Sequence, residues 1–210
     1  MPRLPPADAF YEDAPDPPDL KQMQRMGEHD PFFEAFGQRE KLVDLAQSLL
    51  GQPVTPMGVE WFNKPARDGR PTPPHQDGYY FCLVPDEALT IWIALADVDP
   101  QNGCLHYRRG SHLEGIRPHG QSEVLGFSQT ILDFSDKDRN EPFVGIVRRG
   151  DALVHHSATI HWAQANRCAQ PRPSLAVVFR SSRAVLDDAK FDAYRNSSRQ
   201  QQQALGVRPS

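Results

Sequence analysis

A histidine and an aspartate separated by one residue, His75 and Asp77, form the clearest candidate for chemistry in this sequence. Both fall within residues 72–83, whose aromatic content predicts a β-strand. Because side chains alternate across a strand, the imidazole and the carboxylate would share one face and offer two ligands to a metal ion. A third ligand could come from Asp151, His155, His156 or His161. Two histidines and one carboxylate on one side of an ion form the facial triad that binds non-haem Fe(II).

An arginine follows these histidines and adds weight to the metal hypothesis. The His-x-Asp pattern alone is weak, because such a pair is more often hydrogen-bonded within an ordinary strand. Arg172 comes after the histidine-rich strand, at the start of another predicted strand. A buried guanidinium is a planar fork that can bind a carboxylate at two points. A dicarboxylate that chelates the metal at one end would need such a partner at its other end.

Composition excludes several classes of protein. The 210 residues carry a net charge of −4 and no dense run of Lys or Arg, which argues against nucleic acids and anionic membranes as partners. Cys82, Cys104 and Cys168 have no CxxC spacing, so neither a disulfide framework nor a thiolate zinc site is indicated. The longest apolar stretch, 88–96, is too short to span a bilayer, and the first residues do not resemble a signal peptide. We expect a cytoplasmic protein with a small-molecule substrate; its oligomeric state stays open.

The elements that must position the candidate ligands are mainly short strands. Twenty prolines and 14 glycines favour strands joined by many turns. One amphipathic helix is predicted over 31–50, from a start at Asp30 and Pro31 to a stop at Gly51. Strands are predicted over 54–63, 72–83, 88–96, 103–108, 124–132, 143–148, 151–156 and 175–182. This pattern predicts a mainly β sandwich, barrel or jelly roll.

The chain divides into three parts by composition. Residues 1–29 are rich in proline and predict an extended, flexible arm. Residues 30–195 form a single predicted domain. Residues 196–210 include four consecutive glutamines and predict a flexible tail.

Three blocks of the sequence carry a family resemblance. They read PTPPHQDGYYF, then LTIWIALADVDPQNGCLHYRRGSH, then GDALVHHSATIHWAQANRCAQPRPSLAV. In this order they resemble the phytanoyl-CoA dioxygenase family of Fe(II)- and 2-oxoglutarate-dependent oxygenases, over residues 54–182. The resemblance implies a double-stranded β-helix, which is a cupin-like jelly roll, with a flanking N-terminal helix. It also implies Fe(II) as cofactor, with 2-oxoglutarate and O₂ as co-substrates.

The resemblance also assigns roles to individual residues. The metal ligands that it implies are His75, Asp77 and His161. Four residues are implied near the co-substrate: Arg172 at its far carboxylate, Trp92, and, as weaker candidates, Met57 and Thr90. Related halogenases have Ala or Gly in place of the aspartate, so the presence of Asp77 favours hydroxylation. Where members of the family carry a longer N-terminal region with an additional strand, this chain has the proline-rich arm. Part of the substrate lid is therefore expected to be missing, reshaped or supplied by a partner chain.

Four further residues are candidates for contact with substrate, each with a structural alternative. They are Tyr79, on the expected face of His75; Trp162, beside His161; Asn166; and Lys64. The alternatives are, in the same order, an aromatic core residue, a packing residue, a turn residue and a solvated lysine. Three other residues have weaker claims: His155 and His156 as neighbours of the metal site, and Arg117 as a charge partner of substrate.

The predicted function is therefore hydroxylation of an unactivated C–H bond in a small molecule, with release of succinate and CO₂. Epoxidation and desaturation would use the same iron centre. Two alternatives stay open. One is a non-redox cupin-type isomerase or hydrolase, in which the arginine would have no role. The other is a binding module that keeps the fold without turnover.

Overall fold

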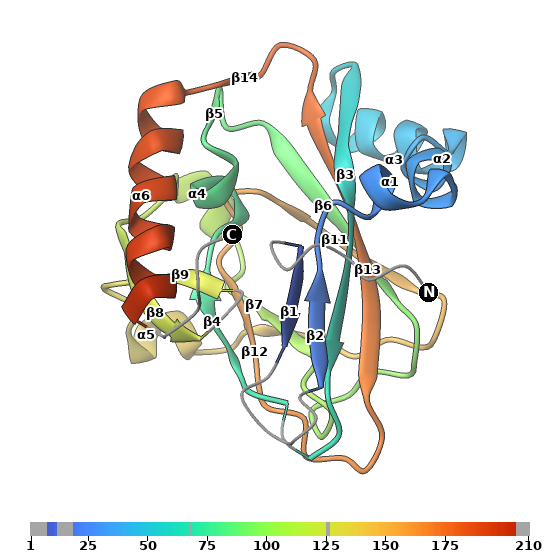
Figure 1. Cartoon of the computed structure of the whole chain (residues 1–210), viewed down its shortest axis with the longest axis vertical. Helices are drawn as coiled ribbons and strands as arrows, with labels where there is room; N and C mark the ends of the chain where they lie inside the picture. The colour runs from blue at the N-terminus through green and yellow to red at the C-terminus, as the bar shows by residue number, and fades with distance from the viewer. Residues whose placement is uncertain (1–7, 12–18, 68, 125–126, 205–210) are drawn as a thin grey trace.

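The computed structural model describes residues 8–11, 19–67, 69–124 and 127–204 (Figure 1). Its larger sheet has six antiparallel strands in the order β1-β2-β3-β13-β6-β11. These strands are β1 (Ala9–Tyr11), β2 (Leu20–Met23), β3 (Val54–Lys64), β13 (Arg172–Ser181), β6 (Ala88–Ala94) and β11 (Ala152–His156). The smaller sheet has the order β10-β7-β12-β4. Its strands are β10 (Phe143–Gly145), β7 (Leu105–Tyr107), β12 (His161–Ala163) and β4 (Thr72–His75). The predicted fold class, a mainly β jelly roll, is confirmed.

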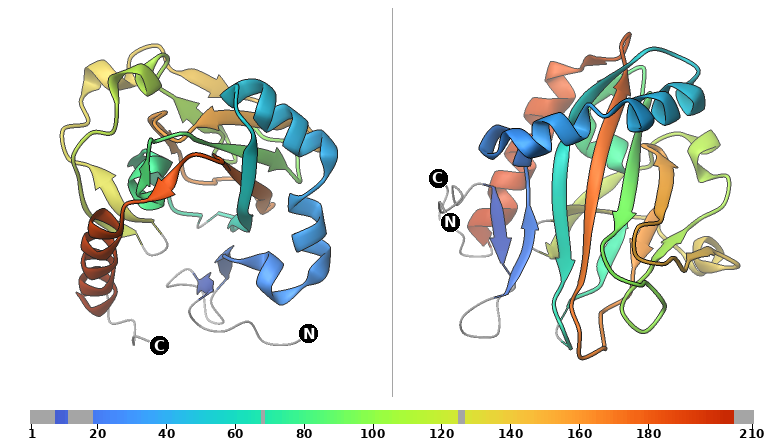
Figure 2. Two further views of the ribbon diagram at one scale, coloured as in Figure 1. Left: turned by 90° about the horizontal axis from the view of Figure 1, so that it is seen from above. Right: turned by 90° about the vertical axis from the view of Figure 1, so that its right-hand side faces the viewer.

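Three helices cover the outer face of the larger sheet (Figure 2). They are α1 (Met26–His29), α2 (Pro31–Gly37) and α3 (Glu40–Leu50). The core beneath them includes Val177 and Phe179 of β13, which are fully buried. Because side chains alternate along a strand, their neighbours Ala176 and Val178 face the interior between the two sheets. One face of β13 therefore stabilises the fold while the other is available for a site.

The single helix predicted over 31–50 is two helices. The predicted start is correct, since the Asp30 side chain accepts a hydrogen bond from the Phe32 backbone N–H at 2.9 Å. The chain leaves the helical conformation at Gln38 and Arg39. Gly37 lies so close to the sheet that an added Cβ would stand 3.2 Å from Val59 Cγ2. The change of direction lets apolar side chains of both helices reach the same core.

The expectation of a flexible arm over 1–29 is wrong for the part that the structure describes. Strand β2 pairs with the edge of β3, β1 pairs with β2, and α1 follows. The Asn63 side chain donates to the Leu20 carbonyl at 3.1 Å and helps to fix this added edge. The proline-rich arm therefore contributes two strands to the larger sheet. Residues 1–7 and 12–18 lie outside the described residues.

The expected tail is also ordered over most of its length. Helix α6 (Asp188–Ala204) continues through residues 196–204, and only 205–210 lie outside the described residues. Gln201 Nε2 donates to the Ser122 carbonyl at 2.7 Å, and Gln129 Nε2 donates to Ser197 Oγ at 3.0 Å. These contacts hold the helix against the hairpin of β8 (His119–Val124) and β9 (Phe127–Ile131). Glutamine is a good helix former, so tertiary contacts suffice to order this stretch.

The strand predicted over 72–83 ends early. Strand β4 stops at His75, and a short helix, α4 (Asp77–Phe81), begins two residues later. Gln76 lies at this change and still has an extended backbone. Its fully buried side chain donates to the carbonyls of Gly115 and Ala158 and accepts from the Arg117 backbone N–H. These three bonds anchor the chain at the point where the strand ends and the helix begins.

The remaining elements complete the connections. They are β5 (Leu83–Val84), which pairs with β14 (Val185–Leu186), the 3₁₀-helix η1 (Ser111–Glu114) and α5 (Asp136–Arg139). No helix within the described ranges is both long enough and apolar enough to cross a bilayer.

Candidate functional site

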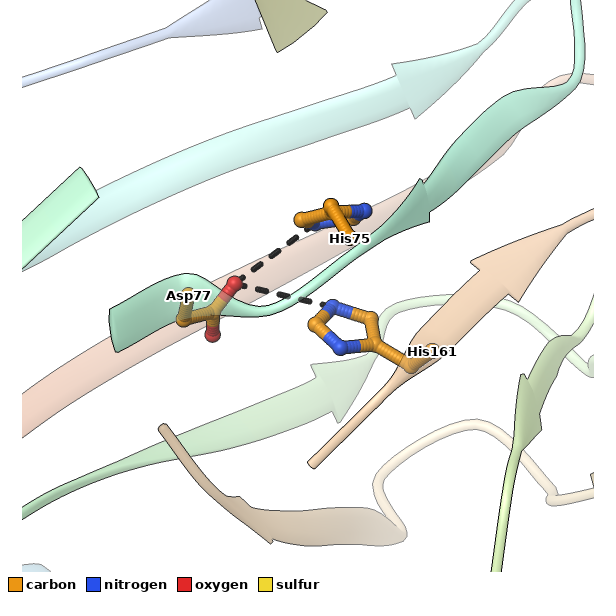
Figure 3. A group of neighbouring side chains, drawn as sticks. All are labelled: His75, Asp77 and His161. Carbon is orange, nitrogen blue, oxygen red and sulfur yellow. Dashed lines mark ion pairs between the residues drawn. The ribbon is translucent and has the colours of Figure 1, made fainter. Parts of the chain in front are cut away.

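The three predicted metal ligands come together between the two sheets (Figure 3). His75 ends β4 and His161 begins β12, and the two are direct partners in the antiparallel register. Asp77 follows at the first turn of α4. Its Oδ1 lies 3.6 Å from Nε2 of each histidine, and the three ligand atoms lie within 4.8 Å of one another. The geometry is that of a site that one ion could occupy.

Both histidines direct Nε2 toward Asp77 Oδ1. Nδ1 of His75 lies 2.8 Å from the Pro73 carbonyl, and Nδ1 of His161 lies 3.0 Å from the Thr159 carbonyl. A carbonyl oxygen can only accept, so Nδ1 carries the proton and Nε2 keeps its lone pair. Burial lowers the pKa of His75, and burial together with His75 lowers the pKa of His161 far below its usual value. Both rings are therefore neutral, as metal ligation requires.

The Asp77 carboxylate is oriented by two donors. Thr90 Oγ1 donates to Oδ2 at 2.7 Å, and His155 Nε2 lies 3.1 Å from the same oxygen. His155 is held in turn by the Tyr107 hydroxyl, 3.1 Å from its Nδ1. Burial alone would raise the pKa of Asp77, but the surrounding histidines, His161 first, outweigh it and lower that pKa. The carboxylate is thus ionised, with Oδ2 occupied and Oδ1 directed at the two ligand histidines. This donor set, two neutral imidazoles and one carboxylate, fits Fe(II).

Arg172 is a buried cation with no counter-ion among the residues that the structure describes. Its Nη1 donates to Ser174 Oγ and its Nη2 to the Gly103 carbonyl, both at 3.2 Å, whereas Nε has no partner. Within the described residues, no carboxylate forms an ion pair with it. The guanidinium lies 5.0 Å from the centroid of the Trp92 ring. Burial lowers the pKa of Arg172 to about 10. Burying an unpaired charge is costly, so this arrangement fits an anionic ligand that completes the hydrogen bonds.

A cavity of about 300 Å³ joins the two features. Its lining includes the three ligand residues, Arg172, and three residues expected near the co-substrate or substrate, namely Trp92, Thr90 and Lys64. Lys64 stands beside Arg172 in the register of β3 and β13, and its Nζ donates to the Arg70 carbonyl at 2.6 Å. Lys64 is therefore a buried residue of the cavity rather than a solvated lysine.

Four of the predicted cofactor- or substrate-binding residues do not line the cavity. They are Met57 and Tyr79, described first, and Trp162 and Asn166. Met57 is 41% exposed and lies outside the cavity, next to an irregularity in the β3–β13 register. Tyr79 is replaced in the cavity wall by Tyr80, because α4 is helical where a strand was expected. The Tyr79 ring instead stacks on His119, with centroids 4.3 Å apart.

Trp162 and Asn166 have structural roles. Trp162 stacks on the His106 ring at 5.6 Å, on the strand face opposite to that of its neighbour His161. The Asn166 amide donates to the carbonyls of Lys64 and Gln170 and accepts from the Cys168 backbone N–H. These bonds hold the turn before β13, which positions Arg172.

Arg117 and His156, which were weaker candidates, do not line the cavity either. Arg117 forms ion pairs with Asp133 and Asp138. His156 accepts a hydrogen bond from the Ala158 backbone N–H, and burial lowers its pKa. Of the two adjacent histidines, only His155 faces the metal site.

Sequence reasoning missed several residues of the cavity wall, among them Gln22, Glu60, Tyr80 and Tyr194. Strand alternation from Lys64 would have indicated Glu60, since the two residues are four apart on one strand. Tyr194 comes from α6, and Gln22 from β2, where no strand or helix was expected. Their positions depend on tertiary packing that no local pattern announces.

Comparisons with known proteins agree with this site. A profile of the family described as phytanoyl-CoA dioxygenase matches residues 7–174. The peroxisomal phytanoyl-CoA dioxygenase of Mus musculus is 30% identical over 166 residues, which are 76% of this chain and 49% of that protein. The chain spans about half the length of the curated relatives that it matches.

Solved structures share the fold. The non-heme alpha-ketoglutarate-dependent carbocyclase SnoK from nogalamycin biosynthesis superposes with a TM-score of 0.70 at 25% identity, over 85% of this chain and 70% of that one. The epimerase SnoN, solved with Fe³⁺, alpha-ketoglutarate and nogalamycin RO, gives a TM-score of 0.69 at 23% identity over 85% and 70% of the two chains. The group formed by His75, Asp77 and His161 and the family match agree with the expected Fe(II), 2-oxoglutarate and O₂. The match over most of its length shows that this chain belongs to the phytanoyl-CoA dioxygenase family.

Proposed function

We propose that the protein is an Fe(II)- and 2-oxoglutarate-dependent oxygenase that hydroxylates a C–H bond of a small molecule and releases succinate and CO₂. The observation that carries the proposal is the cavity that connects the His75, Asp77 and His161 group to Arg172. A 2-oxoglutarate molecule has one end that chelates a metal and one carboxylate left over. The cavity offers a partner for each end.

The residues of the chain bind and orient the reactants. His75, Asp77 and His161 would hold the iron, and Arg172 would hold the distal carboxylate with support from Trp92. Bound there, Fe(II) with 2-oxoglutarate and O₂ supplies the oxidising power that breaks a C–H bond. The protein contributes a fixed geometry and a site enclosed between two sheets, and no side chain needs to act as a general base.

The proposal also specifies the type of oxidation, which is hydroxylation. SnoK and SnoN are described as a carbocyclase and an epimerase, so one fold supports several outcomes. Asp77 favours hydroxylation over halogenation, because its carboxylate occupies the place that a halide would need. A non-redox cupin-type isomerase or hydrolase is the second candidate, but it leaves the buried Arg172 without a partner.

Spectroscopy of the protein loaded under anaerobic conditions tests the proposal. Adding Fe(II) and then 2-oxoglutarate should produce a visible charge-transfer band, and admitting O₂ with a substrate should release succinate. Asp77→Ala should lose the band, and Arg172→Met should require much more 2-oxoglutarate to form it. Met57→Ala is the matched control, because Met57 is exposed outside the cavity. A wild-type protein that binds Fe(II) but forms no band would contradict the proposal and favour the cupin-type alternative.

A further inference from the structure

A second polar group lies in the same cavity, on the side formed by β2 and β3. Glu60 projects from β3, and its Oε2 accepts a hydrogen bond from Gln22 Nε2 of β2 at 3.1 Å. Its other oxygen, Oε1, forms no hydrogen bond with a described residue. No cation forms an ion pair with Glu60 among the described residues, although Lys21 and Lys64 line the same cavity. The carboxylate therefore faces the cavity without a partner of opposite charge.

The buried atoms of β2 and β3 that lack a hydrogen-bond partner in this cavity are both acceptors, whereas the unsatisfied donor, Arg172 Nε, belongs to β13. Gln22 is 2% exposed, and its Oε1 has no hydrogen-bond partner. The amide orientation follows from Glu60, because a reversed Gln22 would place two acceptors against each other. Asn63, which also lines the cavity, leaves its buried Oδ1 without a partner while its amide group donates to Leu20. Buried acceptors without donors are costly. The wall of the cavity that is formed by Gln22, Glu60 and Asn63 is therefore suited to a ligand that brings donors.

The wall stands beside the place proposed for 2-oxoglutarate. Glu60 and Trp92 are both paired with Ala176, so they flank it on the same face of the larger sheet. Neighbouring strands lie about 4.8 Å apart, which puts the backbones of Glu60 and Trp92 roughly 10 Å from each other. Ala176 is small and leaves the space between them open to the cavity. A molecule in this space would lie next to the co-substrate rather than in its place.

An ammonium group matches this wall better than a hydroxyl group does. An ammonium carries three donors and no acceptor, whereas a hydroxyl brings an acceptor that would meet further acceptors here. Its positive charge also compensates the carboxylate, and charge-assisted hydrogen bonds are about twice as strong as neutral ones. The raised pKa of Glu60, about 7 because of burial, is consistent with a carboxylate that lacks a cation.

We propose that Glu60, supported by Gln22, binds a protonated amine of the substrate, so that the enzyme acts on small primary amines. This inference rests on the proposed function for the meaning of "substrate", but the binding itself needs no catalysis. A cavity of about 300 Å³ is at the lower end of the range for small-molecule sites, so the enclosed part of the substrate is small.

Calorimetric titration of the full chain with matched probes tests this proposal. The probes are cyclohexylamine with cyclohexanol, benzylamine with benzyl alcohol, and hexylamine with hexanol, at pH 8 and without metal. Each amine should bind at least about tenfold more tightly than its alcohol, because one charge-assisted hydrogen bond contributes that much or more. Glu60→Gln should remove this preference and leave alcohol binding unchanged. Glu123→Gln, an exposed residue of β8, is the matched control and should retain the preference.

The two proposals fail in different ways. Equal binding of amines and alcohols by the wild type, or an unchanged preference in Glu60→Gln, would overturn the amine proposal. The charge-transfer band with Fe(II) and 2-oxoglutarate reports separately on the proposed function, and its presence in Glu60→Gln also shows that the variant is folded. Loss of the band with an intact amine preference would overturn the oxygenase proposal and leave the amine site standing.

Discussion

His155 Nε2 lies 3.1 Å from Asp77 Oδ2, the carboxylate oxygen that does not face the two ligand histidines. An ionised carboxylate can only accept, so His155 donates from Nε2 and receives a hydrogen bond from the Tyr107 hydroxyl at Nδ1. Together with Thr90, His155 fixes the rotation of the carboxylate. Oδ1 is consequently the oxygen of Asp77 that remains available to a metal.

Replacing His155 should therefore weaken metal binding without removing a ligand. We expect His155→Phe to lower Fe(II) affinity by about 10- to 100-fold, the usual effect of losing a hydrogen bond that orients a metal ligand. His155→Gln keeps a donor and should recover part of the affinity. Anaerobic titration with Fe(II) measures both variants, with His112→Phe, an exposed histidine, as the control. Unchanged affinity in His155→Phe would show that Thr90 alone orients the carboxylate.

Arg172 should strengthen the binding of 2-oxoglutarate and at the same time destabilise the ligand-free protein. Arg172→Met removes a buried, unpaired charge, so we expect the ligand-free protein to become more stable by roughly 1–4 kcal/mol. The same change should weaken 2-oxoglutarate binding by at least about tenfold, because the charged hydrogen bonds are lost. Arg172→Lys keeps the charge without the planar fork and should fall between the two. Urea unfolding and ligand titration measure the two effects; a variant that is both less stable and unaffected in binding would contradict the role assigned to Arg172.

The stability of the ligand-free protein should depend on the ionisation of Glu60. Burial raises the pKa of Glu60 from 4.5 to about 7, so between these pH values the native state binds more protons than the unfolded state does. The free energy of unfolding should therefore fall as the pH rises from about 4.5 to 7, by at most about 3 kcal/mol from this group, and by less where water fills the cavity. Glu60→Gln should flatten this part of the profile, whereas Glu123→Gln should not. Identical profiles for all three proteins in urea unfolding would show that Glu60 is well solvated.

Gly103 should be intolerant of a side chain. It has a φ of +83°, and an added Cβ would stand 2.5 Å from the Gln164 carbonyl oxygen and 2.8 Å from Lys64 Cδ. We expect Gly103→Ala to cost more than the roughly 1–2 kcal/mol of left-handed backbone strain, and to displace the carbonyl that accepts from Arg172. Gly51→Ala is the matched control, since Gly51 has a φ of +64° with open space around it and should show the strain alone. Equal losses in thermal unfolding would mean that the loop of Gly103 can move aside.

Part of the site could be predicted from residue types and spacing, namely the pair His75 and Asp77 and the following Arg172. The third ligand was left among four residues by the sequence pattern, and only the family resemblance singled out His161, which the antiparallel register places opposite His75. The substrate side was less predictable, because it depends on where the chain changes from strand to helix. The chain is helical from Asp77, where a strand was expected, and this places Tyr80 rather than Tyr79 in the cavity wall.

Residues 20–23 and 196–204 show the same limit of prediction from local sequence. Residues 20–23 have no strand pattern of their own, and they form β2 because β3 offers an unpaired edge. Residues 196–204 are polar, and they form a helix because Ser122 and Gln129 supply partners for it. Composition suggested flexible segments at both ends because it contains no information about the surfaces that they meet.

The pairing of β2 with β3 divides the cavity between two distant portions of the chain. The candidate metal ligands and Arg172 come from residues 75–172, whereas Gln22 belongs to β2, which lies between β1 and β3 at one margin of the larger sheet. The two strands at this margin can be altered with little disturbance to the centre of the sheet. Exchanging β1 and β2 would therefore change the substrate side of the cavity while leaving the candidate metal ligands in place, which makes this pair of strands a natural starting point for engineering.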